Sequence, residues 1–111
     1  MAAKIELSQA RNGKFRFALK SANGRIVVTS ELYEKRVGVS NGIKSLRANS
    51  DKDTAYNRKT ARNGKPYFVM IAKNGKTIAK SQQYASTATM EKGIRAVKNT
   101  AKDAEVNDLT K

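Results

Sequence analysis

The sequence contains neither cysteine nor histidine, and these two absences limit both fold and chemistry. Without cysteine there is no disulfide, and without either residue there is no Cys/His metal site. Catalysis also loses its most common general base and its most reactive nucleophile. No spacing among serine, tyrosine and lysine singles out a substitute pair. The sequence therefore indicates a protein that is not an enzyme and that binds no cofactor or metal ion.

Acidic residues are also scarce, with 9 Asp and Glu against 23 Lys and Arg, a net charge of +14. The excess is spread evenly, because residues 10–50 and residues 61–101 each carry a net charge of +7. Charge of this size governs non-specific association and encounter rates, and it does not indicate a fold.

Long apolar runs are missing as well. Residues 1–6 show no secretory signal, and no stretch is apolar enough to cross a membrane. The expectation is a cytoplasmic location and no membrane partner.

What the chain does contain is a tandem repeat. At a constant offset of 51 residues, 12 of 41 positions are identical between residues 10–50 and 61–101. A repeat of about 40 residues is too small to form a stable core of its own without disulfides, a metal ion or a partner. We therefore expect a monomer with one domain, residues 1–111, built from repeats of about 4–53 and 54–109 related by a pseudo-twofold axis.

The first part of each repeat has the pattern of antiparallel strands. Ile5 and Leu7 alternate with polar neighbours, and residues 14–20 place apolar side chains on one face only. Asn-Gly pairs separate the strands, at Asn12-Gly13 and Asn23-Gly24 and again in the second copy, and this pair is typical of a type I′ hairpin turn.

The second copy of the strands differs from the first in two ways. Tyr56 aligns with Ile5 and is expected to open the strand 56–60. The following strand, 66–71, is apolar on both faces, so one face is expected to meet the other repeat or a partner. Pro66 cannot donate a ladder hydrogen bond and should lie at a strand start or on an edge.

The second part of each repeat has helical periodicity. Apolar residues and one glycine share a helix face in both copies, Val39, Gly42, Ile43 and Leu46 in the first and Met90, Gly93, Ile94 and Val97 in the second. Glycine on the inner face predicts a close approach of helix to sheet. The tail 104–109 is either an edge strand or a frayed end.

The repeated motifs resemble those of a known family. They are the Asn-Gly hairpins, Ser30-Glu31-Leu32-Tyr33, Gly42-Ile43-Lys44-Ser45-Leu46-Arg47-Ala48-Asn49, Ser81-Gln82-Gln83-Tyr84 and Gly93-Ile94-Arg95-Ala96-Val97-Lys98. In this order and spacing the whole chain resembles the YegP-like family of small bacterial proteins of unknown function. The resemblance implies two β3-α-β units that share one sheet, each exchanging its last strand, with Val106 in a strand. It implies no activity.

Together these patterns predict an α+β fold. The expected architecture is a single antiparallel sheet made by two tandem β3-α-β repeats with pseudo-twofold symmetry, and both helices are expected on one face of it.

The first candidate site consists of the repeated Ser30/Tyr33 and Ser81/Tyr84 pairs. They either form a hydroxyl clamp for an anion, or they satisfy loop backbone groups and pack their rings.

Basic residues form two further candidates for binding a polyanion. At the hairpin tips Arg11, Lys14, Arg62 and Lys65 flank exposed amides that could hold a phosphate. On the helices Lys44, Arg47, Arg95 and Lys98 would form one basic stripe if the axis brings the helices side by side. A solvated turn and a solvated helix face are the alternatives.

The stretch Tyr67-Phe68-Val69 does not match the aromatic motif of RNA-recognition domains. With the motif aligned on Phe68-Val69, none of the other positions fits the pattern: Gly64, Lys65, Pro66, Tyr67 and Ile71. The favoured function is a non-catalytic binding module with weak, sequence-independent affinity for nucleic acid or another polyanion. The alternative is a structural or oligomerising protein whose charge only keeps it in solution.

Overall fold

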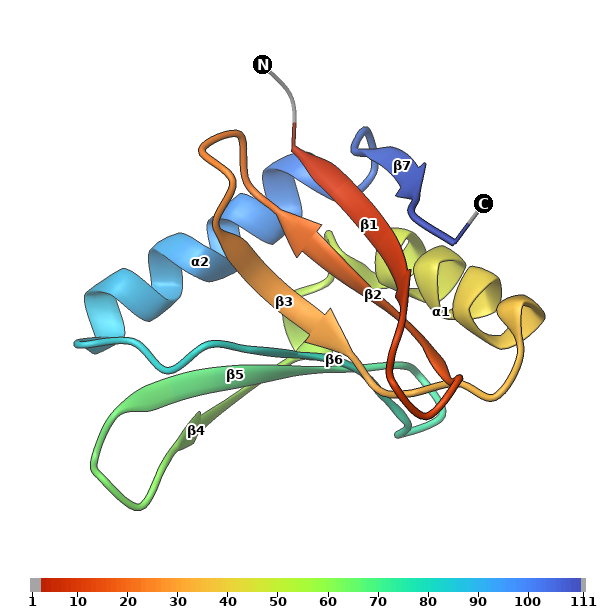
Figure 1. Cartoon of the computed structure of the whole chain (residues 1–111). Coiled ribbons are helices and arrows are strands. Elements are labelled where there is room, and N and C mark those ends of the chain that lie inside the picture. Colours follow the sequence, from red (N-terminus) through yellow and green to blue (C-terminus); the bar gives the residue numbers. More distant parts are fainter. Residues whose placement is uncertain (1–2, 111) are drawn as a thin grey trace.

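The structure is a computed structural model that describes residues 3–110; of the predicted domain 1–111, residues 1–2 and 111 lie outside the described part. Two repeats of three strands and a helix are followed by one further strand (Figure 1). The elements are β1 Lys4–Gln9, β2 Phe15–Lys20, β3 Ile26–Ser30, α1 Arg36–Asn49, the 3-10 turn η1 Asp53–Ala55, β4 Tyr56–Thr60, β5 Pro66–Ile71, β6 Thr77–Ser81, α2 Thr87–Thr100 and β7 Glu105–Asp108.

All seven strands belong to one sheet, in the order β4-β5-β6-β3-β2-β1-β7. The predicted α+β fold is confirmed, and so is the predicted edge strand at Val106. The sheet is mixed rather than wholly antiparallel, because β7 pairs with β1 in parallel. The repeat offset explains this. At this offset residues 105–108 align with 54–57, which include the start of β4, and β4 is itself the equivalent of β1. The twofold axis reverses the strand direction at each step, so β4 runs opposite to β1 and β7 runs parallel to β1. Since β1 already occupies that place in the sheet, β7 lies outside it.

The strands after the helices cross between repeats. β4 follows α1 and pairs with β5 of the second repeat, whereas β7 follows α2 and pairs with β1 of the first. Each helix therefore leads into a strand at the edge of the other half.

A pseudo-twofold axis runs through the middle of the sheet. β3 and β6 pair as Val28↔Ser81, Thr29↔Lys80 and Ser30↔Ala79. The offset of 51 exchanges the first and last of these pairs and maps the central pair onto itself. The axis thus passes between Thr29 and Lys80, as a two-repeat fold requires.

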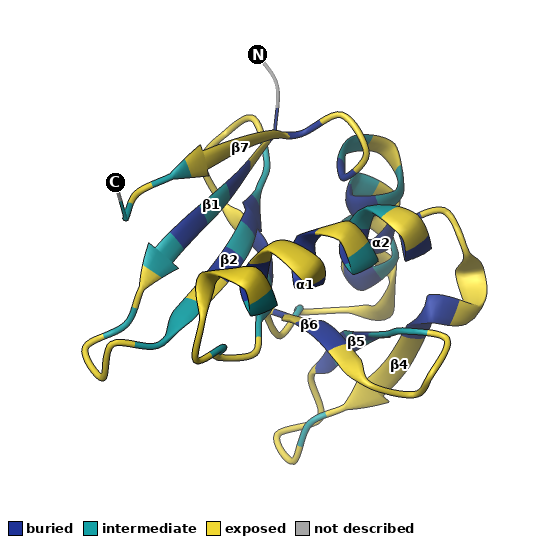
Figure 2. Ribbon diagram, turned by 90° about the vertical axis from the view of Figure 1, so that its right-hand side faces the viewer, coloured by how far each residue is buried: buried dark blue, intermediate teal, exposed yellow. Residues whose placement is uncertain are grey.

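Both helices cover the same face of the sheet, and the other face is open (Figures 1 and 2). α1 contacts β2 and β6, and α2 contacts β5 and β3, so each helix rests on both repeats. The buried apolar side chains form one cluster. Equivalent positions are buried alike, as predicted for Phe17 and Phe68, for Ile43 and Ile94, and for Leu46 and Val97.

The four Asn-Gly hairpins form as predicted, but their turn type was predicted wrongly. Only the glycines have positive φ, +82° to +84°, whereas a type I′ turn needs positive φ at the asparagine too. In the first hairpin the Gly13 amide donates to Ala10 O at 3.0 Å and the Ala10 amide to Lys14 O at 2.7 Å. This is a type I turn followed by a glycine bulge, the usual three-residue hairpin.

The helix glycines make room for a tyrosine rather than for the backbone of the sheet. A Cβ built on Gly42 would lie 2.5 Å from the Tyr33 hydroxyl oxygen and 3.1 Å from Cε2 of Phe17. A Cβ on Gly93 would likewise collide with the hydroxyl of Tyr84. The predicted close approach is therefore real, and the group that approaches is the ring of a loop residue lying between helix and sheet.

Candidate polyanion interface

The two serines of the Ser/Tyr pairs have structural hydrogen bonds. Ser30 Oγ accepts from the Phe17 amide at 2.9 Å and donates to the Glu31 carbonyl at 2.7 Å. Ser81 makes the same two bonds, to the Phe68 amide at 2.9 Å and the Gln82 carbonyl at 2.8 Å. Each hydroxyl bridges a gap where the β2–β3 or β5–β6 ladder ends. The interpretation as loop backbone partners fits these contacts.

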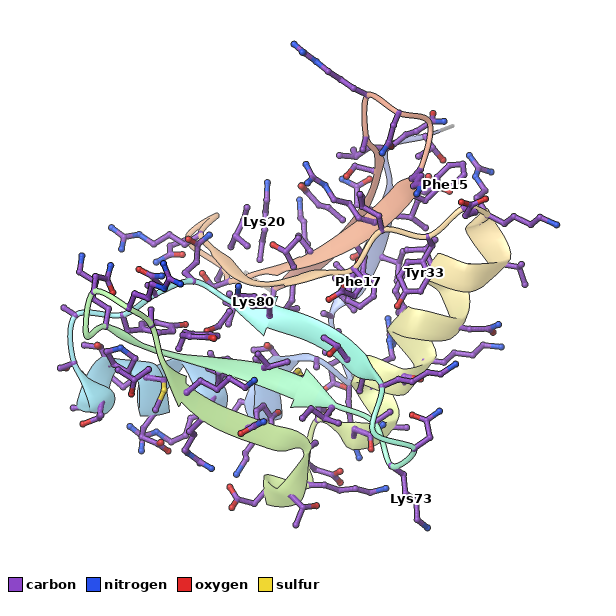
Figure 3. The ribbon with its side chains drawn as sticks, turned by 90° about the horizontal axis from the view of Figure 1, so that it is seen from below. Phe15, Phe17, Lys20, Tyr33, Lys73 and Lys80 are labelled. Atoms are coloured by element: carbon purple, nitrogen blue, oxygen red, sulfur yellow. The ribbon has the colours of Figure 1, made fainter. Side chains whose placement is uncertain are left out.

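The two tyrosines pack against the helices. Figure 3 shows Phe17 and Tyr33 side by side next to α1. In the second copy the rings of Phe68 and Tyr84 are stacked, with centroids 6.3 Å apart. Burial raises the pKa of both tyrosine hydroxyls, and the nearby Glu31 adds to the effect at Tyr33. The Tyr33 and Tyr84 hydroxyls lie against the helix glycines Gly42 and Gly93, so the contacts of both tyrosines are those of packed side chains.

Backbone amides at the hairpin tips are hydrogen-bonded within the turns themselves. Asn12 Oδ1 accepts from the Lys14 amide at 3.0 Å, and Asn63 Oδ1 accepts from the Lys65 amide at 3.0 Å. The glycine amides at both tips are bonded to the preceding alanine carbonyls. Fewer donors remain for a phosphate than the sequence indicated. The tips of the β1–β2 and β4–β5 hairpins also lie far apart in both views (Figures 1 and 2).

Two of the four helix bases are structural. Arg47 donates to the Lys102 carbonyl at 3.0 Å and to the Ala104 carbonyl at 2.8 Å, which fixes the segment between α2 and β7. Lys98, its equivalent in the second repeat, pairs with Asp53 at 3.2 Å and lies 5.5 Å from the centre of the Tyr56 ring. These contacts join each helix end to the crossing strand of the other half.

The other two helix bases, Lys44 and Arg95, are exposed, and the ion pairs of the described residues include neither. The two helices are not among the closely packed pairs of elements in the described part. The structure thus keeps two solvent-facing bases, one on each helix, in place of the predicted stripe of four.

Most of the acidic residues are engaged in ion pairs. Six of the nine acids, Glu6, Glu34, Asp51, Asp53, Glu91 and Asp108, lie within 4.0 Å of a Lys or Arg nitrogen. Hydrogen bonds from Lys98 and then Arg58 lower the pKa of the Asp53 carboxyl, and the bond from Arg58 lowers the pKa of Glu91. Little negative charge is left to neutralise the other bases.

In the second repeat the basic residues have the fewest acidic residues near them in the sequence. Between Asp53 and Glu91 the chain has no acidic residue, and it carries seven bases, Arg58, Lys59, Arg62, Lys65, Lys73, Lys76 and Lys80. This segment supplies β4, β5, β6 and their two hairpins. Figure 3 shows Lys73 at the outer end of the β5–β6 hairpin, pointing away from the sheet.

The open face of the sheet collects bases from both repeats. Strand alternation and pairing place Lys4, Arg16, Lys20, Lys59 and Lys80 on this face. The acids among the paired residues there are Glu6, which is bonded to Lys20 at 2.7 Å, and Glu105 on the edge strand β7, which is paired with Lys4. The alternation in residues 14–20 predicts one face of this strand that is not apolar, but it does not indicate that face as a binding site. The pairing of the two repeats through β3 and β6, which joins their faces, was the missing information.

The open face also holds apolar side chains that no helix covers. Tyr67, Val69 and Ile71 alternate with the buried residues of β5 and are half-buried. The Lys80 ammonium lies 5.1 Å from the centre of the Tyr67 ring, and Lys59 is paired directly with Tyr67 across the strands. The prediction that one face of this strand meets another surface is not fulfilled within the described chain.

No group of three or more metal-ligating side chains occurs among residues 3–110. No helix in this part of the chain is long and apolar enough to cross a membrane.

The geometry defines a class of small α+β proteins built by internal duplication around one shared sheet. The chain belongs to the family described as domain of unknown function DUF1508, whose sequence model matches twice, at residues 10–57 and 61–108. Similar proteins include a UPF0339 protein of Acinetobacter baylyi, 47% identical over 99% of each chain. The UPF0339 protein YegP of Escherichia coli K12 is 43% identical over 99% of this chain and 100% of its own.

Solved structures share the fold. The solution NMR structure of YegP from E. coli matches with a TM-score of 0.93 and 42% identity over 98% of this chain and 94% of that one. The solution NMR structure of a UPF0339 protein from Shewanella oneidensis matches with a TM-score of 0.92 and 41% identity, over 98% and 92%. These relatives establish the family and the fold, and both the family and the YegP structure are described as of unknown function.

Proposed function

We propose that this protein is a non-catalytic binding module that holds nucleic acid or another polyanion weakly and without reading sequence. The observation that carries the proposal is the open sheet face, where five bases stand against Glu6 and Glu105, both on the β1–β7 side, and where β4, β5 and β6 carry no acid. Cations gathered on one uncovered face release counterions when they neutralise phosphates, and this gives affinity that depends on salt.

The distribution of acids supports the same proposal. Asp51 and Asp53 lie in the turns between α1 and β4, and Glu91 lies in α2, and all three are in ion pairs, whereas β4, β5 and β6 have no acid. A surface that served only to keep the protein in solution would not need to keep acids out of three adjacent strands. The competing account, in which the charge has no ligand, predicts no preferred side for an anion.

A titration with salt tests the proposal. The binding of a labelled polyphosphate and of labelled oligonucleotides is followed by anisotropy from low to physiological salt. Each duplex phosphate neutralised adds about −0.9 to the slope of log affinity against log salt, so a contact with about four phosphates gives a steep loss of binding. Absence of binding to any of these polyanions at low salt would overturn the proposal.

Matched charge variants locate the surface. Lys59→Gln with Lys80→Gln removes two charges from the open face, and Lys44→Gln with Arg95→Gln removes two from the helices. We expect the first pair to weaken binding and flatten the slope more than the second. Equal losses would mean that net charge, rather than the open face, controls binding.

A further inference from the structure

The outer surfaces of the two repeats have diverged, although their interiors match. Buried or structural positions correspond in kind, as in Phe17/Phe68, Ser30/Ser81 and Tyr33/Tyr84. On the open face the corresponding positions are unlike: Arg16 against Tyr67, Ala18 against Val69, Lys20 against Ile71, and Thr29 against Lys80. The open face therefore has one half where Lys4, Arg16 and Lys20 lie with Glu6 and Glu105, and one half where an apolar strip is flanked by Lys59 and Lys80 with no acid on its strands.

We propose that the apolar strip of β5, Tyr67, Val69 and Ile71, binds unpaired bases of a single-stranded nucleic acid while Lys59 and Lys80 contact its phosphates. This inference rests on the proposed function and specifies its ligand. Three uncovered apolar side chains in a row form a surface that a ligand can desolvate. The absence of any acid between Asp53 and Glu91 selects an anionic ligand over a second copy of this basic chain.

Tyr67 is the residue that favours a nucleic acid over a simple polyanion. Its ring already lies under the Lys80 ammonium, 5.1 Å from its centre, so its face accepts a cation or a flat base. A base that stacks on the ring frees Lys80 to reach a phosphate beside it. Stacking of this kind tolerates any sequence, because every base has a flat face.

The same geometry favours a single strand over a duplex. Paired bases in a duplex stack on each other and offer a protein only their edges, whereas unpaired bases can be splayed onto an aromatic side chain. The strip spans four residue steps of about 3.3 Å each, enough for only a few nucleotides. At the pseudo-twofold axis Glu31 lines the shallow depression next to Thr29 and Lys80, so phosphates are expected on the β4 side of Lys80.

The test compares two ligands that differ only in their bases. A thymidine or uridine oligonucleotide of about ten nucleotides, within the usual site size, is measured against an abasic oligomer of the same length at low salt. The parent protein should bind the base-containing strand about five-fold more tightly or better, the lower end of what one aromatic stack contributes. Tyr67→Leu, which keeps apolar bulk without a flat ring, should abolish this preference and leave abasic binding unchanged. Tyr67→Phe should retain it.

Each outcome decides a different claim. Equal binding of both oligomers by the parent overturns the stacking inference and leaves the polyanion function standing. No binding of either overturns both. A duplex that competes as well as the single strand, or a Tyr67→Leu variant that keeps the preference with an unchanged denaturation midpoint, contradicts the assignment to this strip.

Discussion

At the scale of single residues, the repeat encodes one local assembly twice. A serine ends the ladder between two strands, a tyrosine three residues later lies over a phenylalanine, and a helix glycine leaves space for the tyrosine hydroxyl. Ser30, Tyr33 and Gly42 recur as Ser81, Tyr84 and Gly93. These identities were visible in the sequence, and in the structure the residues make packing and backbone contacts.

Filling the glycine position is expected to destabilise the fold. Gly42→Leu adds a side chain where even a Cβ would lie 3.0 Å from Cζ of Tyr33, and such overpacking typically costs about 1–3 kcal/mol. Chemical denaturation measures the change, with exposed Ala48→Leu on the same helix as the control. If the midpoints of both variants equal that of the parent, the tyrosine is not held against this helix.

The sequence pattern identified these residues, but it did not predict correctly which group contacts the helix glycine. The glycine was assigned to contact with the sheet, because periodicity shows which face of a helix is inward and not which group meets it. The tyrosine comes from a loop, and its ring could be placed only once the loop path between β3 and α1 was known. For Ser30 the sequence left two alternatives, and the one in which the hydroxyl bonds to backbone groups agrees with its contacts, because loop backbone groups need hydrogen-bond partners.

At the scale of elements, hairpins and crossing strands decide how the repeats join. The asparagine side chain of each tip accepts a backbone amide two residues on, and only the glycine has positive φ. The Asn-Gly signal predicted four hairpins correctly. It predicted their turn type wrongly because the same pair also suits a type I turn with a glycine bulge.

Backbone strain at one tip offers a test of this turn. Gly64 has φ of +83° and open space around it, so Gly64→Ala is opposed by strain alone, about 1–2 kcal/mol. Gly64→Asn should cost less, because asparagine tolerates this conformation. Thermal denaturation compares the two variants, and equal costs would argue against a left-handed residue at the tip.

The crossing of β7 depends on Arg47, which was predicted as a ligand contact. Arg47→Gln removes two hydrogen bonds to the carbonyls of Lys102 and Ala104 and should lower stability by about 1 kcal/mol, a typical net value for such a bond partly exposed to water. Lys44→Gln on the same helix is the matched control and should change stability little. Amide exchange in residues 105–108 should accelerate only in the Arg47 variant. The reverse pattern would restore Arg47 as a free surface base.

At the scale of the whole molecule, duplication produced one core, one axis and two unlike faces. The helix-covered side carries the ion pairs of Arg58 with Asp53 and Glu91, and the open face carries five bases, Glu6 and Glu105 on the β1–β7 side, and the apolar strip of β5. The sequence predicted the single sheet and the side of the helices, because hydrophobic alternation and repeat length determine both. It could not predict which bases share a surface, because that depends on the pairing of β3 with β6.

The charge network around Asp53 should make the fold sensitive to acid. The folded-state pKa values of Asp53 and Glu91 are lowered by their hydrogen bonds, first to Lys98 and to Arg58 respectively. A lowered pKa gives stability that is present above the ordinary carboxyl pKa and is lost as the pH falls through the folded value. Stability should therefore fall below about pH 4, and less steeply in Asp53→Asn than in Asp103→Asn. Parallel pH profiles for both variants would contradict this role.

The measurement that tests the central claim most directly is an NMR titration of the labelled protein with a thymidine oligonucleotide at low salt. The claim is that the open face of the sheet is the ligand surface. Amide shifts should cluster on β4, β5 and β6, around Lys59, Tyr67 and Lys80, and should disappear as salt is raised. Shifts centred on the exposed helix residues around Lys44 and Arg95, or no shifts at all, would contradict it.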